Sequence, residues 1–269
     1  MALSIDQKNR ISEIVKEILL SRIDEVPELS QVFNNVPFHS SIRDSLKNGL
    51  GFLKIELPYL VAIASWLHGL NTSLGSGFES LAHILSGGYK RKFTKSFTLK
   101  IKTSQSINIE SLIRELKSGI RPNLKRENDL IFNFAESEGE VDSLELTIDN
   151  YLESDDLVEG IELKSVRPNS GEGRGEKQKI LYAKAAFKKL HPKKEIKYFV
   201  GFPFDPTSTT PTGYDKERFF NYLIEFKKFF SPKEVLLSGE LWNHLSGEKN
   251  TMEEVLEIIT KTVEKVAKT

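Results

Sequence analysis

From about residue 140 to its end, the chain alternates between stretches of strand length and amphipathic stretches of helix length. IDNYLE and LVEGIELKSV are typical of two strands joined by a tight turn at residues 154–156. A basic helix, a buried strand, a further helix, a last strand and closing helices follow, in EKQKILYAKAAFKKL, IKYFVGF, YDKERFFNYLIEFKKFF, EVLLSGELWNHL and TMEEVLEIITKTVEKVA. This order predicts an α/β fold with a mixed central sheet and helices on its faces.

The N-terminal third has a helical pattern instead. IDQKNRISEIVKEILLSRI places apolar residues at helical spacing after Asp6, the expected cap, and two separate helices are expected at 57–68 and in NTSLGSGFESLAHILSGG. KFTKSFTLKIKT then alternates like a strand. We therefore expect a helical N-terminal region (1–90) packing on a core (91–269), both within one compact domain.

Several classes of protein are excluded or disfavoured by composition. The chain has no cysteine, which rules out disulfides and cysteine-ligated metal sites. Its start lacks the apolar stretch typical of a signal peptide, and its longest apolar run, LVAIASWL, is too short to cross a bilayer. We expect a cytoplasmic protein with no membrane partner.

The charges are balanced overall but strongly segregated. Between Lys90 and Arg126, eleven basic residues stand against two acidic ones, and from Glu127 to Glu162 there are thirteen acidic residues and no basic one. The segment 165–197 is basic again, with ten basic and three acidic residues. Either these are solvated faces that neutralise one another, or an acidic metal site lies beside basic walls that grip a polyanion.

The candidate chemistry lies on the two strands at the acidic block. Side chains alternate along a strand, so Glu162 and Lys164 share a face, and pairing across the turn brings Asp149 beside Glu162. Two converging carboxylates repel unless a cation lies between them, and Mg²⁺ accepts such oxygen ligands together with a carbonyl, here that of Leu163. Lys164 would then stand where it can orient an attacking water.

Asp-x12-Glu-x-Lys is a weak pattern by itself, but with its context it resembles the PD-(D/E)xK nuclease superfamily, and within it type II restriction endonucleases of the TdeIII kind. The stretches that carry the resemblance are NTSLGSGFESLA, IELKSVRPNSGEGRGEKQKIL, FVGFPFDP and LLSGELWNHLSG, spread over roughly residues 35 to 248. The resemblance implies a restriction-endonuclease-like core. One departure is that no Pro-Asp dipeptide precedes the hairpin, because Ile148 stands in the position of that proline.

The resemblance also implies roles for particular residues. Asp149 and Glu162 would bind Mg²⁺, and Lys164 would position the water. Glu79 would reach the same site from its helix, with a solvent-facing glutamate as the equal alternative. Since the Pro-Asp dipeptide is missing, three other residues stay open as the first ligand: Asp142, Asp155 and Asp156.

Polar residues directly after the active strand are expected to touch DNA, namely Asn169, Arg174, Lys177, Gln178 and Lys179. Basic side chains neutralise phosphates, and Arg, Asn and Gln can read base edges. The alternative is a flexible loop followed by a solvated helix face.

The resemblance implies a Mg²⁺-dependent type II restriction endonuclease. It would cut double-stranded DNA at a short palindrome, for which we carry over the GGNCC of the resembled family, and leave 5′-phosphate ends. Reading a palindrome suggests a homodimer, and a cognate methyltransferase would act on the same site. The alternatives are a repair or recombination nuclease of the same superfamily, and a non-catalytic DNA-binding module whose Asp, Glu and Lys residues form a structural ion-pair network.

Overall fold

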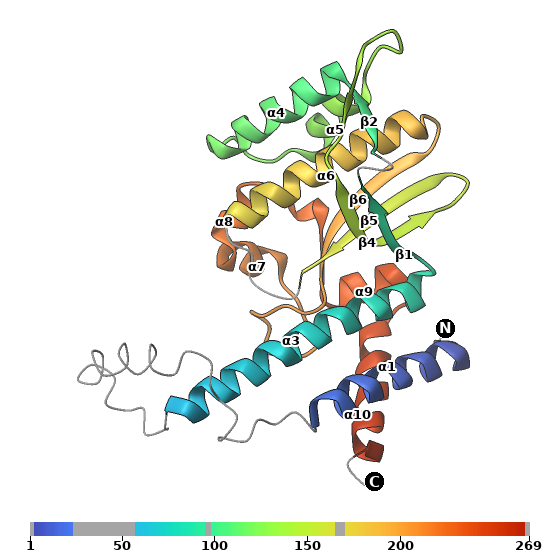
Figure 1. Ribbon diagram of the computed structural model, residues 1–269, viewed down its shortest axis with the longest axis vertical. Helices are drawn as coiled ribbons and strands as arrows, with labels where there is room; N and C mark the ends of the chain where they lie inside the picture. The colour runs from blue at the N-terminus through green and yellow to red at the C-terminus, as the bar shows by residue number, and fades with distance from the viewer. Residues whose placement is uncertain (1–2, 24–56, 95–97, 165–169, 267–269) are drawn as a thin grey trace, which may run out of the picture.

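A five-stranded mixed sheet forms the centre of the molecule in a computed structural model that describes residues 3–23, 57–94, 98–164 and 170–266 (Figure 1). The first two pairs of neighbouring strands are antiparallel and the last two are parallel. In spatial order the strands are β1 (Tyr89–Phe93), β4 (Leu146–Glu153), β5 (Leu157–Leu163), β6 (Glu195–Phe202) and β7 (Val235–Leu237). The predicted α/β fold with a mixed central sheet is confirmed.

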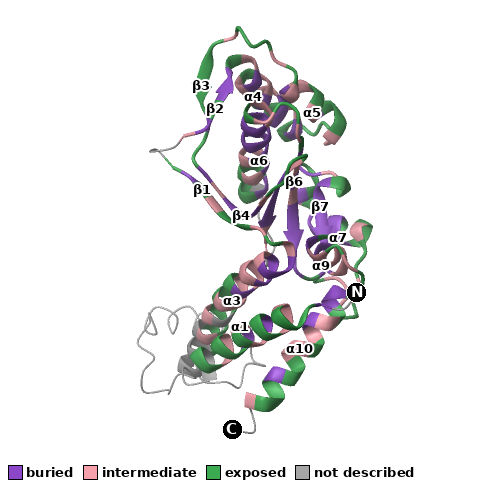
Figure 2. Ribbon diagram, turned by 90° about the vertical axis from the view of Figure 1, so that its right-hand side faces the viewer, coloured by how far each residue is buried: buried purple, intermediate pink, exposed green. Residues whose placement is uncertain are grey.

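Helix α6 (Ser170–Leu190) covers one face of this sheet and connects the parallel strands β5 and β6. A large core lies between them, and Figure 2 shows the buried residues gathered along the sheet and α6. The remaining elements of this half are α4 (Thr103–Lys117), α5 (Leu124–Phe132), α7 (Lys216–Tyr222), α8 (Ile224–Lys227), the 3₁₀ helix η3 (Pro232–Glu234), and the small sheet of β2 (Lys100–Lys102) and β3 (Glu140–Asp142).

A second core lies on the other face of the sheet, where Ile161, Phe199 and Leu236 alternate along their strands with residues of the first core. It includes Ile11, Leu81, Trp242 and Val255 and is built by four helices: α1 (Ile5–Ile23), α3 (Leu57–Ser86), α9 (Gly239–Ser246) and α10 (Thr251–Val266). The helical part thus draws on both ends of the chain, and the expected boundary at residue 90 falls inside β1. The division into two regions stays a prediction.

Helix α3 is one continuous helix, so the prediction of two helices over this segment was wrong. Glycine costs about 1 kcal/mol in a helix interior, so continuity of the helix through Gly77 needs an explanation. A Cβ at Gly77 would lie 2.6 Å from Cδ1 of Ile18 in α1. The glycine therefore allows the two helices to pack closely, and this tertiary contact outweighs its low helix propensity.

The stretch KFTKSFTLKIKT contributes to two sheets and is not the single strand that was predicted. Its start belongs to β1 and pairs with β4, while β2 near its end pairs with β3. Alternation of apolar and polar residues specifies which face is buried, but not which strand is the partner.

The start of α1 differs from prediction. Ser4 accepts a hydrogen bond at 3.2 Å from the backbone N–H of Gln7, so Ser4 is the cap and not Asp6. The same end of the chain is tied to α10, because the Glu254 carboxylate accepts a hydrogen bond at 2.7 Å from the backbone N–H of Leu3.

The segregated charges face one another across the fold. Lys189 pairs with Glu140 at 2.8 Å and Lys194 with Glu153 at 2.9 Å, in each case a basic residue of 165–197 with an acidic residue of the central block. These contacts favour mutual neutralisation for part of the blocks. Within the described ranges, no helix is long and apolar enough to span a membrane.

Candidate active site

The two predicted acids meet where β4 and β5 pair. The paired register ends at Asn150 and Ile161, so Asp149 and Glu162 are the next residues on the two strands, at a point where the pairing of β4 with β1 is irregular. The Asp149 and Glu162 side chains are only 14% and 6% exposed. Asp149 Oδ2 also accepts a hydrogen bond at 3.0 Å from the backbone N–H of Leu163. The two acids therefore lie near each other, close enough for the Asp149 charge to affect Glu162, and their role as metal ligands stays a prediction.

The other three candidates for the first acid lie elsewhere. Asp142 is in β3 of the separate small sheet, and Asp155 and Asp156 lie at the turn between β4 and β5. At roughly 3.3 Å per residue, Asp156 is about 20 Å from Glu162 along the strand. Among these four aspartates, only Asp149 stands beside Glu162.

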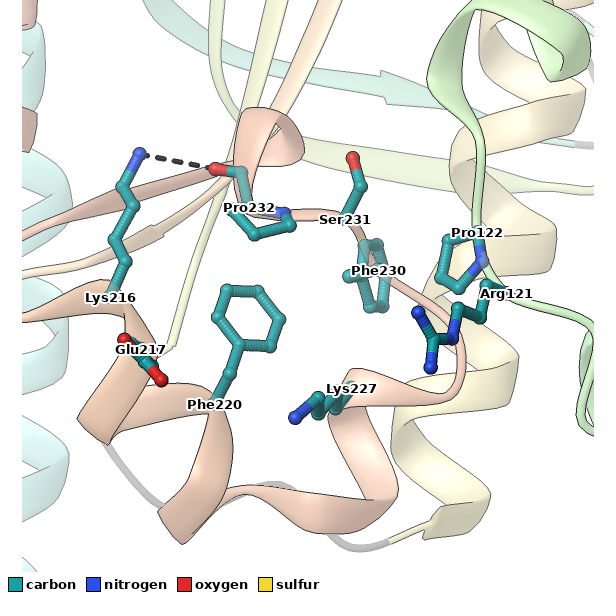
Figure 3. A pocket seen from close by; sticks show the side chains of 9 residues that line it. All are labelled: Arg121, Pro122, Lys216, Glu217, Phe220, Lys227, Phe230, Ser231 and Pro232. Atoms are coloured by element: carbon teal, nitrogen blue, oxygen red, sulfur yellow. Dashed lines mark hydrogen bonds between the residues drawn. The ribbon is translucent and has the colours of Figure 1, made fainter.

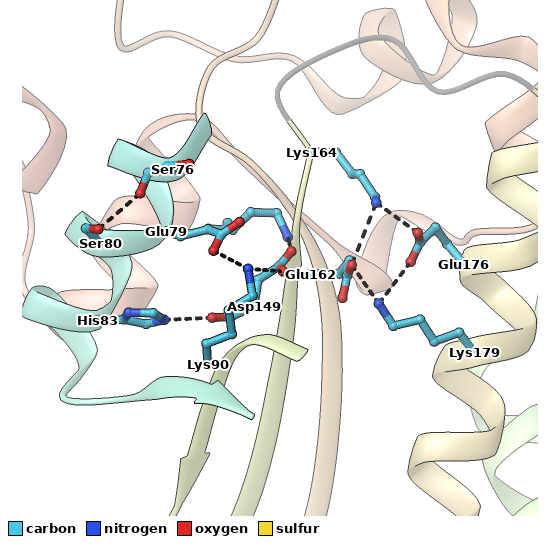
Figure 4. A network of polar contacts seen from close by, with 11 residues as sticks. Ser76, Glu79, Ser80, His83, Lys90, Asp149, Glu162, Lys164, Glu176 and Lys179 are labelled. Atoms are coloured by element: carbon cyan, nitrogen blue, oxygen red, sulfur yellow. Dashed lines mark hydrogen bonds and ion pairs between the residues drawn. The ribbon is translucent and has the colours of Figure 1, made fainter. Parts of the chain in front are cut away.

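Two lysines and a further glutamate surround Glu162 (Figure 4). Lys164 Nζ lies 3.7 Å from Glu162 Oε1 and 2.8 Å from Glu176 Oε1. Lys179 Nζ is closer to Glu162 Oε1, at 2.7 Å, and lies 3.7 Å from Glu176 Oε2. Glu176 and Lys179 project from one face of α6, which brings that helix into the site.

Glu79 reaches the site from α3, on the Asp149 side. Lys90 Nζ of β1 lies 2.6 Å from Glu79 Oε2 and 3.8 Å from Asp149 Oδ1, so it bridges the two acids. His83, one turn after Glu79, fixes the strand through a 2.7 Å hydrogen bond between its Nε2 and the carbonyl of Asp149. Glu79 is therefore in the site, as the resemblance implied for its position, although its role stays a prediction. We call the linked side chains the carboxylate cluster: Glu79, Lys90, Asp149, Glu162, Lys164, Glu176 and Lys179.

Burial makes the negative charge of this cluster costly. Burial is the largest cause that raises the pKa of Glu162 to about 7. The Lys179 charge lowers this pKa, and the Asp149 and Glu176 charges raise it further. The pKa of Asp149 is also raised, again chiefly by burial. The lysines present in the cluster thus compensate the carboxylates only in part.

A divalent cation would fit the unsatisfied atoms of this cluster. The Glu162 and Glu176 Oε2 atoms are buried and accept no hydrogen bond from the described part of the chain. No group of three or more His, Cys, Asp or Glu side chains is arranged as a metal site in the described ranges. The protein ligands available to a cation are thus the carboxylates of Asp149 and Glu162. Two are sufficient for Mg²⁺, which commonly binds one or two carboxylates and keeps several waters.

The structure corrects the prediction that Lys177 contacts DNA. Its side chain is 0% exposed, and its Nζ lies 2.5 Å from carboxylate oxygens of both Glu127 and Glu234. A phosphate cannot approach an ammonium group in this position. Lys177 joins α6 to α5 and η3 inside the protein.

The other predicted DNA contacts have different surroundings. Arg174 is exposed near the start of α6, whereas Gln178 donates a hydrogen bond at 2.9 Å to Glu110 of α4. Lys179 belongs to the carboxylate cluster, and Asn169 lies outside the described residues. Of the four predicted contacts that the structure describes, only Arg174 is placed as an exposed DNA contact would require.

Glu176 and Lys90 were not singled out from the sequence. Glu176 lies three residues before Lys179, a spacing that puts both side chains on one side of a helix. Because this helix follows the strand that carries Glu162, the spacing was a usable signal. Lys90 had no comparable signal, since its place depends on the pairing of β1 with β4.

A pocket of about 440 Å³ opens away from the carboxylates, between α7, α8 and the segment before α5 (Figure 3). Phe220 and Phe230 line it together with Arg121 and Lys227. No residue of the carboxylate cluster is among its lining residues, so the candidate chemistry does not depend on it.

Comparison with known proteins gives the same class of function as the sequence. Residues 3–263 match the family described as "Type II restriction endonuclease, HinfI". The chain is also 45% identical over 265 residues to "Type II restriction enzyme MjaII" of Methanocaldococcus jannaschii, covering 96% of this chain and 71% of that protein. Type II restriction endonuclease activity is thereby confirmed, while the TdeIII kinship and the PD-(D/E)xK assignment stay predictions. The chain belongs to the HinfI family of type II restriction endonucleases.

Proposed function

We propose that this endonuclease cleaves DNA with Mg²⁺ held by Asp149 and Glu162. The observation that carries the proposal is that these two carboxylates, 14% and 6% exposed, lie on neighbouring paired strands, with Lys164 directly after the strand that carries Glu162. When bound, Mg²⁺ would supply Lewis acidity, which lowers the pKa of water and polarises a phosphate. The Leu163 carbonyl is the further ligand expected from the sequence.

The side chains around the two acids would then orient the attacking water and neutralise charge on the phosphate. Lys164 Nζ forms an ion pair with Glu176 Oε1 at 2.8 Å. Its ammonium group can orient the attacking water and offset charge on the phosphate. Glu79 and Lys90 border Asp149 from the opposite side and would limit its movement.

The finer features of the reaction follow from the resemblance. We propose cleavage at a short palindrome, with GGNCC as the first site to test, to leave 5′-phosphate ends. A homodimer would read the two halves of the palindrome, with Arg174 among the residues that approach DNA. A cognate methyltransferase would protect the same site.

The deciding experiment incubates the purified protein with long phage DNA in EDTA and in Mg²⁺, and sequences the ends. We expect discrete fragments with 5′-phosphates only when Mg²⁺ is present. A repair or recombination nuclease would ignore intact duplex and cut branched DNA. A binding module with a structural ion-pair network would bind DNA and cut nothing under either condition.

Lys179 gives a separate prediction, because it lies 2.7 Å from Glu162 and not on a free surface. Lys179→Met is expected to lower the single-turnover cleavage rate about 100-fold at saturating DNA, since one preorganised charge is lost. Lys188→Met on the same helix, whose Nζ binds the Pro192 carbonyl at 2.7 Å, is the control. Weaker DNA binding with an unchanged rate would instead support the original view of Lys179 as a DNA contact.

A further inference from the structure

The Tyr198 hydroxyl is a buried polar group that no role described above uses. Tyr198 lies on β6 and is only 4% exposed. Its oxygen forms no hydrogen bond of regular geometry in the ranges that the structure describes. A buried hydroxyl without such a bond destabilises the folded state, so its presence calls for an explanation.

The strand register places this tyrosine beside the carboxylates. Tyr198 pairs with Gly160, two residues before Glu162, so its side chain lies on the same face as Glu162. A Cβ at Gly160 would lie 2.6 Å from Cε2 and 2.8 Å from Cδ2 of the Tyr198 ring. The ring therefore lies across β5 over the glycine, and it extends toward the strand that carries Asp149.

A tyrosine hydroxyl is a hydrogen-bond donor at neutral pH, and a carboxylate is an acceptor. The Glu162 side chain lies within reach of this hydroxyl, because a hydrogen-bond interaction with Glu162 is among the causes that, after burial and the carboxylate charges, raise the pKa of Tyr198 well above its ordinary value. The interaction is not a hydrogen bond of regular geometry, since the Tyr198 hydroxyl and the Glu162 Oε2 atom are both buried without one in the described ranges. The lysines contact the other oxygen, Oε1.

We propose that Tyr198 is a positioning residue, whose hydroxyl donates a hydrogen bond to Glu162 Oε2 when the carboxylate turns to bind a divalent cation. The inference rests on the proposed role of Glu162 as a metal ligand. Hydrogen bonds to ligating carboxylates orient them, and loss of such a partner commonly weakens metal binding 10- to 100-fold. Gly160 is required for this placement, since only a residue without a side chain leaves room for the Tyr198 ring.

The test is Tyr198→Phe, which removes one oxygen and keeps the ring. Unfolding midpoints are measured over a Mg²⁺ series without DNA, because a ligand that binds the folded state raises the midpoint. We expect an unchanged or higher midpoint in EDTA, and about 10-fold more Mg²⁺ for an equal rise in midpoint. The Mg²⁺ concentration for half-maximal cleavage should move by the same factor.

Tyr151→Phe is the matched control, because Tyr151 is equally buried and pairs with Gly160 from β4. Its hydroxyl donates to Glu153 at 2.7 Å, so this variant should leave the Mg²⁺ series unchanged. Gly160→Ala, which displaces the Tyr198 ring, should weaken the response to Mg²⁺ even though the hydroxyl is retained.

The outcomes separate this inference from the proposed function. If Tyr198→Phe loses stability in EDTA and responds to Mg²⁺ like the unmodified protein, the hydroxyl is structural and the inference is wrong. If the unmodified protein shows no response to Mg²⁺ and cuts DNA in EDTA, the proposed metal site itself fails.

Discussion

Glu162→Gln is expected to lower the rate of DNA cleavage by at least about 1,000-fold while leaving DNA binding intact. The amide keeps the shape of the side chain but removes the charge that a cation requires, and losses of this order follow removal of preorganised charge in active sites. Binding should be equal or tighter, because a carboxylate close to the DNA backbone repels phosphates. Single-turnover cleavage in Mg²⁺ and gel-shift titration in EDTA measure the two effects.

Glu159→Gln serves as the control for this variant. Glu159 is buried on the same strand, but on the opposite face, where its Oε2 lies 2.9 Å from Nε2 of His244. It should retain cleavage. An unchanged cleavage rate for Glu162→Gln would rule out the proposed site, whatever the DNA affinity of the variant.

The second large effect concerns stability. Lys177→Met is expected to lower the free energy of unfolding by about 3–5 kcal/mol, because it leaves the carboxylates of Glu127 and Glu234 buried without their shared cation. Urea denaturation followed by circular dichroism measures the loss. If stability is unchanged and only DNA affinity falls, the side chain reaches DNA and its buried position is wrong.

Lys184 on the same helix provides a contrast with Lys177. It is also buried, two turns further along, but burial lowers its pKa from 10.5 to about 8, and in the described ranges it has no ion pair within 4.0 Å. At 1.36 kcal/mol per pKa unit, Lys184→Met should leave stability unchanged or raise it by up to about 3 kcal/mol. Because the folded state holds this proton less tightly than the unfolded chain, the unmodified protein should gain stability as pH rises from about 8 toward 10.5.

The contrast between these lysines shows what a charge pattern leaves open. Lys177 and Lys184 lie at helical spacing with Leu181, on the side of α6 that faces the core. That spacing was readable, but a lysine on such a stripe is equally able to extend to solvent. Glu127 and Glu234 lie 50 residues before and 57 residues after Lys177, and only folding brings them together.

Local patterns were sufficient for the centre of the molecule. The alternation in IDNYLE and LVEGIELKSV, with a polar turn between them, determined a hairpin, and the length of that turn determined a register with Asp149 beside Glu162. The class of enzyme was also readable, through motifs carried by these strands and the helix after them. Interactions within a hairpin are local, so few alternatives compete with them.

Partners distant in sequence were decided by the tertiary structure. Residues 92–103 divide between two sheets, α3 continues through its glycines because α1 packs against Gly77, and Lys90 enters the site through a strand pair that no turn dictates. Tyr198 belongs with these, since its place over Gly160 depends on the parallel pairing of β5 with β6. The amino-acid sequence alone determined which faces are apolar and where the acids stand along each strand. Which faces meet depends on the summed burial of the whole chain, which no local stretch encodes.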